Sequence, residues 1–371
     1  MINKADIKPR MLMGPGPSDV HPRVLEAMAM PPLAYLDSQF LEILDDIRQM
    51  LKAVFQTNNE LTLAVSGTGS AGMETCVVNL IEPGDKMLVC AAGFFGMRMK
   101  EVAERAGARV TTIEVPWGRV FTIEQVEQAL RDHGPFKVVG IVHAETSTGA
   151  AQPIEPISRA VHDAGALLLV DAVTSLGGME VNVDGWEIDA CFSVSQKCLS
   201  CPPGLAPVTF SPAAEQVMAD RKSNVQSWYL DMNMVRRYWG PERVYHHTAP
   251  INMNYALHEA LHIVLEEGLQ ACWQRHRKYH LALKAGLEEM DLTYLADPDH
   301  LLPMLNAVAV PEGVDDAEVR NRLSNEYGIS VGGGLGEFKG NAWRIGLMGQ
   351  SASQRHVDAF LSGLKTVLAD R

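Results

Sequence analysis

The sequence predicts an α/β protein in which helices cover both sides of a large, mostly parallel sheet, followed by a smaller α+β part. Between residues 61 and 194, short apolar runs alternate with helical stretches, as in consecutive βαβ units. Beyond residue 250 this alternation gives way to a long helical stretch and a few short elements. A chain of 371 residues also exceeds one ordinary core, which favours two domains.

In the first part, residues 1–20 are expected to form an extended arm, because "GPGPSD" is too rich in proline and glycine for a helix. Residues 39–54 have apolar side chains at helical spacing. Six apolar runs are predicted strands buried on both faces: 61–65, 86–91, 109–114, 137–142, 166–170 and 189–194. The predicted helices between them are 70–81, 96–106, 123–132 and 154–164.

The second part is expected to begin with one helical segment over residues 253–290. A strand near 304–310, a helix near 315–326 and the glycine-rich run "VGGGLGEFKGNAWRIGLMG" follow. A final helix is predicted over 352–369, with Ser351 or Ser353 as its cap. We therefore expect an arm at 1–20, a large domain at 21–250 and a small domain at 251–371.

Composition excludes several classes of function. The chain is 47% hydrophobic and 21% charged, as in soluble globular proteins, and its net charge of −13 disfavours nucleic-acid and anionic membrane surfaces. It has no apolar run of about 18 residues, no secretory signal and no C-terminal lipidation signal. Six scattered cysteines do not indicate a disulfide framework, so a reducing cytoplasm is the expected location.

Residues 66–75, "SGTGSAGMET", contain the glycine pattern Gly67-x-Gly69-x-x-Gly72. A strand, a glycine turn and a helix beginning near Ser70 make an anion site, because backbone N–H groups and the helix dipole attract phosphate. The same pattern occurs in dinucleotide-binding folds, but there an acidic residue ends the second strand and binds the ribose. Here the second strand, "KMLVCAA", runs into "GFFG" and supplies no carboxylate. A tight turn that merely needs glycines remains an alternative.

Two further residues accompany this phosphate loop. Asp171 ends an apolar strand in "LLLVDAVTSLGG", at the edge where parallel sheets place ligands. Lys197 follows another apolar run in "CFSVSQKCLSCPPG", where partial burial would lower its pKa and make it a nucleophilic amine. A phosphate site, a carboxylate and an amine are the three groups that pyridoxal 5′-phosphate needs. The pair Phe94–Phe95 could stack on its ring.

At this point the chain resembles the class V, fold-type I aminotransferases, in particular the alanine–glyoxylate and serine–glyoxylate aminotransferase group. Eight runs spread over nearly the whole chain carry the resemblance: "LMGPGPSDVHPRVLEAM", "VFQTNNELTLAVSGTGSAGMET", "NLIEPGD", "HAETSTGAAQPI", "LLLVDAVTSLGG", "SVSQKCLSCPPG", "YHHTAPI" and "WRIGLMG". In combination these runs are far more specific than the glycine pattern, and they favour pyridoxal phosphate over NAD.

The resemblance implies roles for the residues around the cofactor ring. Lys197 corresponds to the lysine that forms the Schiff base (an aldimine), and Asp171 to the partner of the pyridine nitrogen. Val173 would lie under the ring and Phe95 would stack on it. Thr146, in "HAETSTG", would hydrogen-bond the ring hydroxyl.

The resemblance also implies contacts to the phosphate and to the substrate. The backbone amides of Gly69 and Ser70 would bind the phosphate, with Gln196 beside it. In the family, the Tyr and Thr of the "YHHT" run reach that phosphate from the neighbouring subunit. Here these are Tyr245 and Thr248, so a homodimer with shared active sites is implied.

Arg344, in "WRIGLMG", corresponds to the arginine that binds the substrate α-carboxylate, in agreement with the bidentate geometry of a guanidinium. Two positions depart from a well-known animal branch of the family: Phe95 replaces a Trp and Ser70 replaces a His. Both departures leave the subfamily open.

The expected activity is transamination from a small L-amino acid, such as alanine or serine, to glyoxylate or pyruvate. Lys197 would move the α-proton, while Asp171 would keep the ring nitrogen protonated. A lyase or an aminophosphonate transaminase of the same family is the nearest alternative, although Arg344 favours a carboxylate substrate. An NAD-binding protein, a zinc hydrolase and a non-catalytic binding protein are the remaining alternatives.

Several other motifs carry weaker signals. His258-Glu259-x-x-His262 matches the HExxH pattern of zinc hydrolases, but the segment is typical of an amphipathic packing helix, so no metal is expected. The run "RHRKYH", with His276 and His280, is typical of a solvated helix face. Cys198-x-x-Cys201 lacks the second cysteine pair that a zinc or redox site would favour. No cysteine follows Cys272, so the chain has no candidate for the mobile-loop cysteine of a desulfurase. His143 is either a pocket residue or a structural one.

Overall fold

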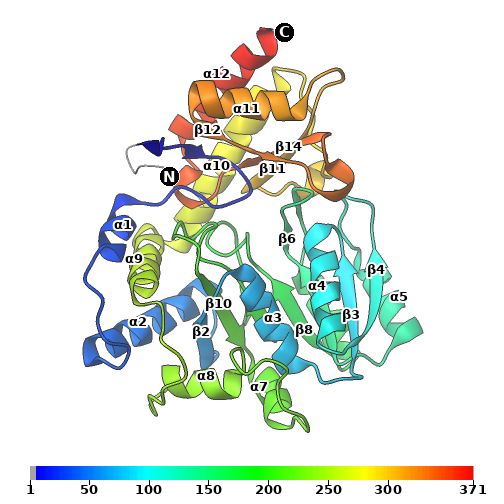
Figure 1. Cartoon of the computed structure of the whole chain (residues 1–371). Helices are drawn as coiled ribbons and strands as arrows, with labels where there is room; N and C mark the ends of the chain where they lie inside the picture. The colour runs from blue at the N-terminus through cyan, green and yellow to red at the C-terminus, as the bar shows by residue number, and fades with distance from the viewer. Residues whose placement is uncertain (1–5, 371) are drawn as a thin grey trace.

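The computed structural model describes residues 6–370, and its centre is a seven-stranded sheet in the order β2-β10-β9-β8-β5-β3-β4 (Figure 1). Six strands are mutually parallel, and β10 runs antiparallel to both of its neighbours. The strands are β2 (Leu61–Ser66), β3 (Lys86–Ala91), β4 (Arg109–Glu114), β5 (Val138–Val142), β8 (Leu167–Asp171), β9 (Ala190–Phe192) and β10 (Leu205–Phe210). The predicted α/β class with a mostly parallel sheet is confirmed.

Helices connect the strands and cover the sheet. Helices α3 and α4 lie in front of it in Figure 1 and pack on β9, β10 and β3. The helices of this part are α1 (Pro22–Met28), α2 (Ser38–Phe55), α3 (Gly69–Leu80), α4 (Phe94–Arg105), α5 (Ile123–His133), α6 (Glu155–Asp163), α7 (Pro212–Ala219), α8 (Met232–Trp239) and α9 (Ile251–Glu267). Their starts follow local chemistry: in α5, Thr122 and Gln125 form a reciprocal capping box.

Two expectations about the strands were wrong. Strand β4 is only partly buried, because it forms the edge of the sheet. Strand β10 was missed, because Pro207 cannot donate a ladder hydrogen bond and argues against a central strand. In the structure the Pro207 carbonyl accepts a hydrogen bond from the Ser193 N–H at 2.8 Å, so one ladder bond is kept at this position.

The C-terminal part lies above the large sheet in Figure 1 and has a small antiparallel sheet in the order β11-β14-β13. Its strands are β11 (Leu305–Ala309), β13 (Gly332–Gly333) and β14 (Ala342–Gly346), and its helices are α10 (Leu269–Glu288), α11 (Asp316–Tyr327) and α12 (Gln354–Ala369). Short 3₁₀ turns are η2 (Pro298–His300), η3 (Gly336–Phe338) and η4 (Gly349–Ser351). Ser353 caps α12, as predicted, while Ser351 lies in η4.

The N-terminal arm joins the two parts. Strand β1 (Met11–Leu12) pairs in parallel with β12 (Ile329–Ser330) of the C-terminal part. Residues 1–5 of the predicted arm lie outside the described residues. A further short hairpin, β6 (Ala144–Glu145) with β7 (Ala150–Ala151), lies beyond the end of β5. The arm and this hairpin both border the site described below.

Buried apolar residues form two main clusters. One contains the large sheet and its helices, including α9 and Cys272, and the other contains Met13 and residues of 283–367. The division of the chain at residue 250 stays a prediction, and the two clusters meet within helix 269–288, between Cys272 and Leu283. In the described part of the chain, no helix has the length and hydropathy needed to cross a bilayer.

The predicted continuous helix over 253–290 was wrong. It breaks at Gly268, whose backbone has φ 84° and ψ 138°, so α9 and α10 are separate helices. Residues with a Cβ adopt this conformation only with strain, whereas glycine adopts it freely. The break allows α9 to pack on α1 and α2 while α10 packs on α12.

We expect Gly268→Ala to lower the free energy of unfolding by about 1–3 kcal/mol, because the break requires a backbone conformation that is open only to glycine. The matched control is Gly328→Ala at the end of α11, where φ is 68° and ψ is 22°. A Cβ meets no atom within 4 Å at either position, so the comparison isolates the backbone term. Urea denaturation should show a smaller loss for the control, about 1 kcal/mol, since alanine tolerates this left-handed region better. Equal losses would contradict the assigned role of Gly268.

Candidate active site

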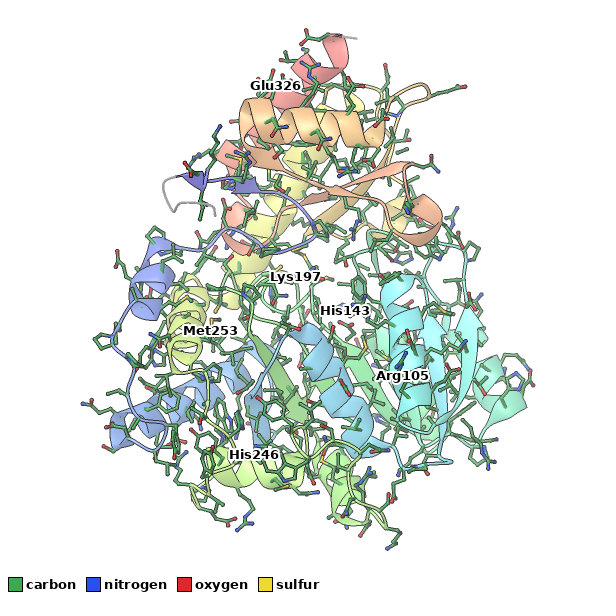
Figure 2. The ribbon with its side chains drawn as sticks, viewed as in Figure 1. Arg105, His143, Lys197, His246, Met253 and Glu326 are labelled. Atoms are coloured by element: carbon green, nitrogen blue, oxygen red, sulfur yellow. The ribbon has the colours of Figure 1, made fainter. Side chains whose placement is uncertain are left out.

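A cavity of about 260 Å³ opens at the carboxyl ends of the parallel strands, and Lys197 and Asp171 both line it. Asp171 is the last residue of β8, and Lys197 lies in the loop between β9 and β10. The starts of α3 and α4 add Gly69, Ser70 and Phe95 to the wall. Figure 2 shows Lys197 between the large sheet and the C-terminal part. The structure therefore brings together side chains that lie far apart in the sequence.

Lys197 is 8% exposed, and its ammonium donates a hydrogen bond to the Pro15 carbonyl of the N-terminal arm. Burial lowers the pKa of Lys197 to about 8, and the nearby Arg344 cation acts in the same direction. Gly16 makes this approach possible: its φ is +112°, and a Cβ there would lie 2.8 Å from Cε of the lysine. The result is a partly neutral amine in a protected place, which suits a nucleophile or a base.

Asp171 is buried, and its Oδ1 accepts a hydrogen bond from the Val173 N–H at 2.8 Å. Burial raises the pKa of Asp171 to about 7, and the Glu145 carboxylate acts in the same direction. The Val173 N–H, Lys197 and Arg98 act in the opposite direction. A cation bound next to Asp171 would lower this pKa and hold the carboxylate in its ionised form.

The glycine loop supplies an anion site and also a packing contact. Thr68, the N-cap of α3, makes no side-chain capping bond within the described residues, and the first-turn amides of a helix lack partners inside it. Gln196 contributes a buried Oε1 that has no hydrogen-bond partner among residues 6–370. Gly72 has a different role, because a Cβ there would lie 3.0 Å from the Ala206 Cβ and 3.3 Å from the Phe192 Cβ. It lets α3 pack closely on β9 and β10.

Phe95 lies in the first turn of α4 and lines the same cavity as Val173. Its ring lies 5.6 Å from the Phe94 ring, nearly edge to face. The Arg98 guanidinium lies over both rings, at 4.9 Å and 5.2 Å from their centroids. Arg98 also lines the cavity, and nothing in the sequence distinguished it from an ordinary helix residue.

Thr146 and Arg344 lie next to each other beside the cavity. Arg344, on β14, donates from Nη1 to the Thr146 carbonyl (3.3 Å) and from Nε to the Gly333 carbonyl (2.7 Å). Burial lowers the pKa of Arg344 to about 10, so the guanidinium remains charged at neutral pH. Its position near Lys197 is what a carboxylate-binding arginine requires, although neither Thr146 nor Arg344 is among the residues that line the cavity.

Tyr245 and Thr248 do not reach this cavity in their own chain. They lie between α8 and α9, with 3.5 Å between the Tyr245 hydroxyl and the Thr248 Oγ1. Tyr245 is 52% exposed, and its ring lies 4.9 Å from the ring of Tyr35. The expected contribution of this pair to the site of a neighbouring subunit stays a prediction.

Sequence reasoning missed several residues of the site. Pro15, Gly16 and Pro17 were assigned to an extended arm, yet they line the cavity. Glu145 is buried directly behind the start of α4, where it accepts hydrogen bonds from the N–H groups of Phe95 and Gly96. Its position after a predicted strand, in the quoted run "HAETSTG", was a signal of the same kind as that of Asp171.

The histidines of "RHRKYH" do not form a solvated face, and this prediction was wrong. His276 is fully buried, contacts the Cys272 carbonyl through Nδ1 and accepts from the Gly349 N–H through Nε2. His280 is buried against the Asn306 Oδ1 at 2.6 Å. Burial lowers the pKa of His276 to about 4, so this residue is a neutral structural link between α10 and η4.

The other motif residues also have structural partners. His258 contacts Asp46 (3.3 Å), and Glu259 pairs with Arg23 (2.6 Å). Within residues 6–370, no group of three or more His, Cys, Asp or Glu side chains could hold a metal ion. The six cysteines are free and buried, and Cys198 donates from Sγ to the Thr174 carbonyl.

His143 is buried against the Trp186 ring, 5.4 Å away, and its backbone N–H donates to the Asp171 carbonyl. Burial lowers the pKa of His143 to about 4. It is not among the residues that line the cavity, and its buried Nδ1 has no hydrogen-bond partner among residues 6–370.

We expect the Lys197 amine to react with a small aldehyde at a rate that rises with pH and levels off above about 8, because only the neutral amine is a nucleophile. An ordinary exposed lysine, with a pKa of about 10.4, should still be accelerating there. Reductive methylation with formaldehyde, followed by peptide mass spectrometry, measures Lys197 and the exposed lysines in the same sample. A Lys197 profile identical to that of the exposed lysines would contradict the effect of burial.

Comparison with known proteins supports this geometry. The solved structure of alanine–glyoxylate aminotransferase from Nostoc sp. superposes with a TM-score of 0.97 at 48% identity, over 99% of this chain and 97% of that one. The (S)-ureidoglycine–glyoxylate transaminase of Bacillus subtilis is 38% identical over 97% of this chain and 90% of its own. Alanine–glyoxylate aminotransferase of Mus musculus is 39% identical, over 97% and 87%.

The superposition on the Nostoc structure, and on the solved ureidoglycine–glyoxylate aminotransferase of Bacillus subtilis (TM-score 0.96, 40% identity, over 98% of this chain and 94% of that one), confirms the predicted type I transferase fold. The Aminotransferase class-V family matches residues 17–337, which include the glycine loop, Asp171 and Lys197. The resemblance predicted from the eight sequence runs is thereby confirmed, and the protein belongs to the class V aminotransferases.

Proposed function

We propose that this protein is a pyridoxal 5′-phosphate-dependent transaminase that moves the amino group of a small L-amino acid, such as alanine or serine, to glyoxylate or pyruvate. The observation that carries the proposal is one cavity that joins a buried amine, a buried carboxylate and the start of a helix. Relatives named as glyoxylate transaminases, at 38–48% identity, support glyoxylate as the acceptor.

The chain's residues fit the cofactor. The first-turn amides of Gly69 and Ser70 would bind the phosphate end, and Gln196, which lines the same cavity, would donate to it from the side-chain Nε2. Phe95 and Val173 would hold the two faces of the ring, with Thr146 at its hydroxyl. When bound, pyridoxal phosphate supplies an aldehyde for the amine and a ring that withdraws electrons from the reacting carbon.

Three side chains of the protein would then each have one role in the reaction. The ionised Asp171 would hold a proton on the pyridine nitrogen, since an anion beside a cation raises the pKa of that cation. Lys197, with its pKa lowered to about 8, would take the proton from the α-carbon of the donor as a base and return it as an acid. Arg344 would bind the α-carboxylate through its planar guanidinium.

Arg344 also bears on the alternatives within the family. A carboxylate substrate satisfies this buried cation, which disfavours an aminophosphonate transaminase. A lyase would use the same Lys197 and Asp171, so the fate of the amino group distinguishes the two reactions. The free, buried cysteines support a reducing compartment, the cytoplasm, as the location.

The absorption spectrum of the protein loaded with pyridoxal phosphate tests the proposal. We expect a visible band that one small amino acid removes and that glyoxylate restores, because the two half-reactions store the amino group and release it. Lys197→Ala should lose the band of the covalently bound cofactor. A wild-type protein without a visible band after incubation with pyridoxal phosphate would contradict the proposal, and ammonia release without a 2-oxo acid acceptor would favour a lyase.

We further propose a homodimer in which Tyr245 and Thr248 reach the phosphate site of the partner. Their exposure, together with that of the neighbouring Trp228 (60%) and Val244 (39%), supports a subunit interface at this segment. A hydroxyl pair delivered across the interface would make each site depend on both chains.

Subunit mixing tests this arrangement. Lys197→Ala and the double variant Tyr245→Phe/Thr248→Ala should each be nearly inactive as homodimers, but mixed dimers should regain activity. In a mixed dimer, one site combines the intact Lys197 of one chain with the intact Tyr245 and Thr248 of the other. The amplitude of the visible band and the turnover after denaturation and joint refolding provide the measurement, and chains refolded separately are the control. No recovery in verified mixed dimers would show that the pair acts within its own chain.

A further inference from the structure

We propose that Glu145, assisted by Ser147, is a positioning residue that fixes the ring of Phe95 by capping helix α4 from a distant strand. This inference rests on the proposed function, in which Phe95 stacks on the cofactor. It concerns a different residue, because Glu145 contacts the start of the helix and is not among the residues that line the cavity.

The need for such a cap follows from the sequence of the helix start. The N-cap of α4 is Gly93, which has no side chain to receive the N–H groups of the first turn. Phe94, Phe95 and Gly96 are the first three residues of the helix, so their amides need partners from elsewhere. The side chains of this segment therefore cannot pair the amides of the turn that carries Phe95.

Glu145 and Ser147 supply these partners. One oxygen of Glu145, Oε2, accepts from the N–H groups of Phe95 (3.1 Å) and Gly96 (3.3 Å). The Ser147 Oγ accepts from the Phe94 N–H at 2.9 Å. All three orphan donors of the first turn are thereby satisfied by residues about 50 positions away, and the negative carboxylate also complements the helix dipole.

The carboxylate is itself held in place. Its other oxygen, Oε1, accepts from the Ser147 N–H at 3.1 Å and from the Ser147 hydroxyl at 2.6 Å. Burial raises the pKa of Glu145, and these hydrogen bonds oppose that shift by favouring the ionised form. Four donors on one buried carboxylate leave it a single orientation.

Gly93 is matched to this arrangement. A Cβ at Gly93 would lie 2.5 Å from the Ser147 Oγ and 2.7 Å from the Glu145 Cγ. Because Gly93 has no side chain, Glu145 and Ser147 can occupy the space next to it. The cap therefore fixes Phe95 relative to residues 145–147. The same segment carries Thr146, whose carbonyl contacts the proposed carboxylate-binding Arg344.

The test compares Glu145→Gln with Glu101→Gln, which lies on the same helix and removes only an exposed ion pair with Arg105. A glutamine has one acceptor oxygen instead of two, so it cannot serve both Ser147 and the helix start. We expect about a tenfold weaker affinity of the apoprotein for pyridoxal phosphate, equivalent to about 1.4 kcal/mol. The visible circular dichroism per bound cofactor should also change, because a loosened Phe95 no longer fixes the ring. Glu101→Gln should behave as wild type in both measurements.

Two further variants keep the inference testable if Glu145→Gln folds poorly. Ser147→Ala removes only the Phe94 cap and one contact of Glu145, so a smaller change in the same two readouts is expected. Gly93→Ala leaves every capping group present but displaces it, and should resemble Glu145→Gln. Unchanged affinity and dichroism in folded Glu145→Gln, with only the melting temperature lowered, would overturn the positioning role. Failure of the wild type to bind pyridoxal phosphate would instead overturn the proposed function.

Discussion

The parallel register of β5, β8 and β9 is the constraint on which the site depends. In this register Val142, Asp171 and Phe192 are neighbours across the sheet, so the three strands end at one edge. Each chain segment then leaves the sheet on the same side: β8 and the segment after β9 bring Asp171 and Lys197 into the cavity, and the segment after β5 lies beside it. The antiparallel β10 returns the chain after Lys197, which lets the loop around the lysine close over that edge.

Burial at this edge gives the two central groups their chemistry. Desolvation disfavours charge on both, which lowers the pKa of Lys197 to about 8 and raises that of Asp171 to about 7. For Lys197 the lowered pKa lies near neutrality, where a proton-transferring group is most effective, whereas the raised pKa of Asp171 would fall again beside a bound cation. Neither shift arises from a single partner, so the enclosure of the whole cavity maintains them.

The cavity also depends on segments outside the large sheet. The N-terminal arm supplies the Pro15 carbonyl to Lys197, and the same arm pairs through β1 with β12 of the C-terminal part. Behind Lys197, the Ser200 hydroxyl accepts from the Gln350 N–H, and Arg275 on α10 donates to the Gly349 carbonyl (2.6 Å). The Ser200–Gln350 contact connects the lysine loop to the part of the chain that carries Arg344, and the Arg275 contact holds η4 against α10. The site is therefore built where the arm, the sheet edge and the C-terminal part meet.

The sequence by itself determined the α/β class, the positions of most strands and helices, and the family, because these depend on local periodicity and on short runs of residues. It also identified Asp171 and Lys197, since each directly follows an apolar strand. Only the tertiary structure decided what depends on contacts between distant segments: the central strand with Pro207, the helix break at Gly268 and the burial of His276. Only the tertiary structure also showed the hydrogen bond from Lys197 to the Pro15 carbonyl and the one from the Phe95 N–H to Glu145. A hydrogen bond between residues 50 or more positions apart leaves no periodic pattern in the sequence.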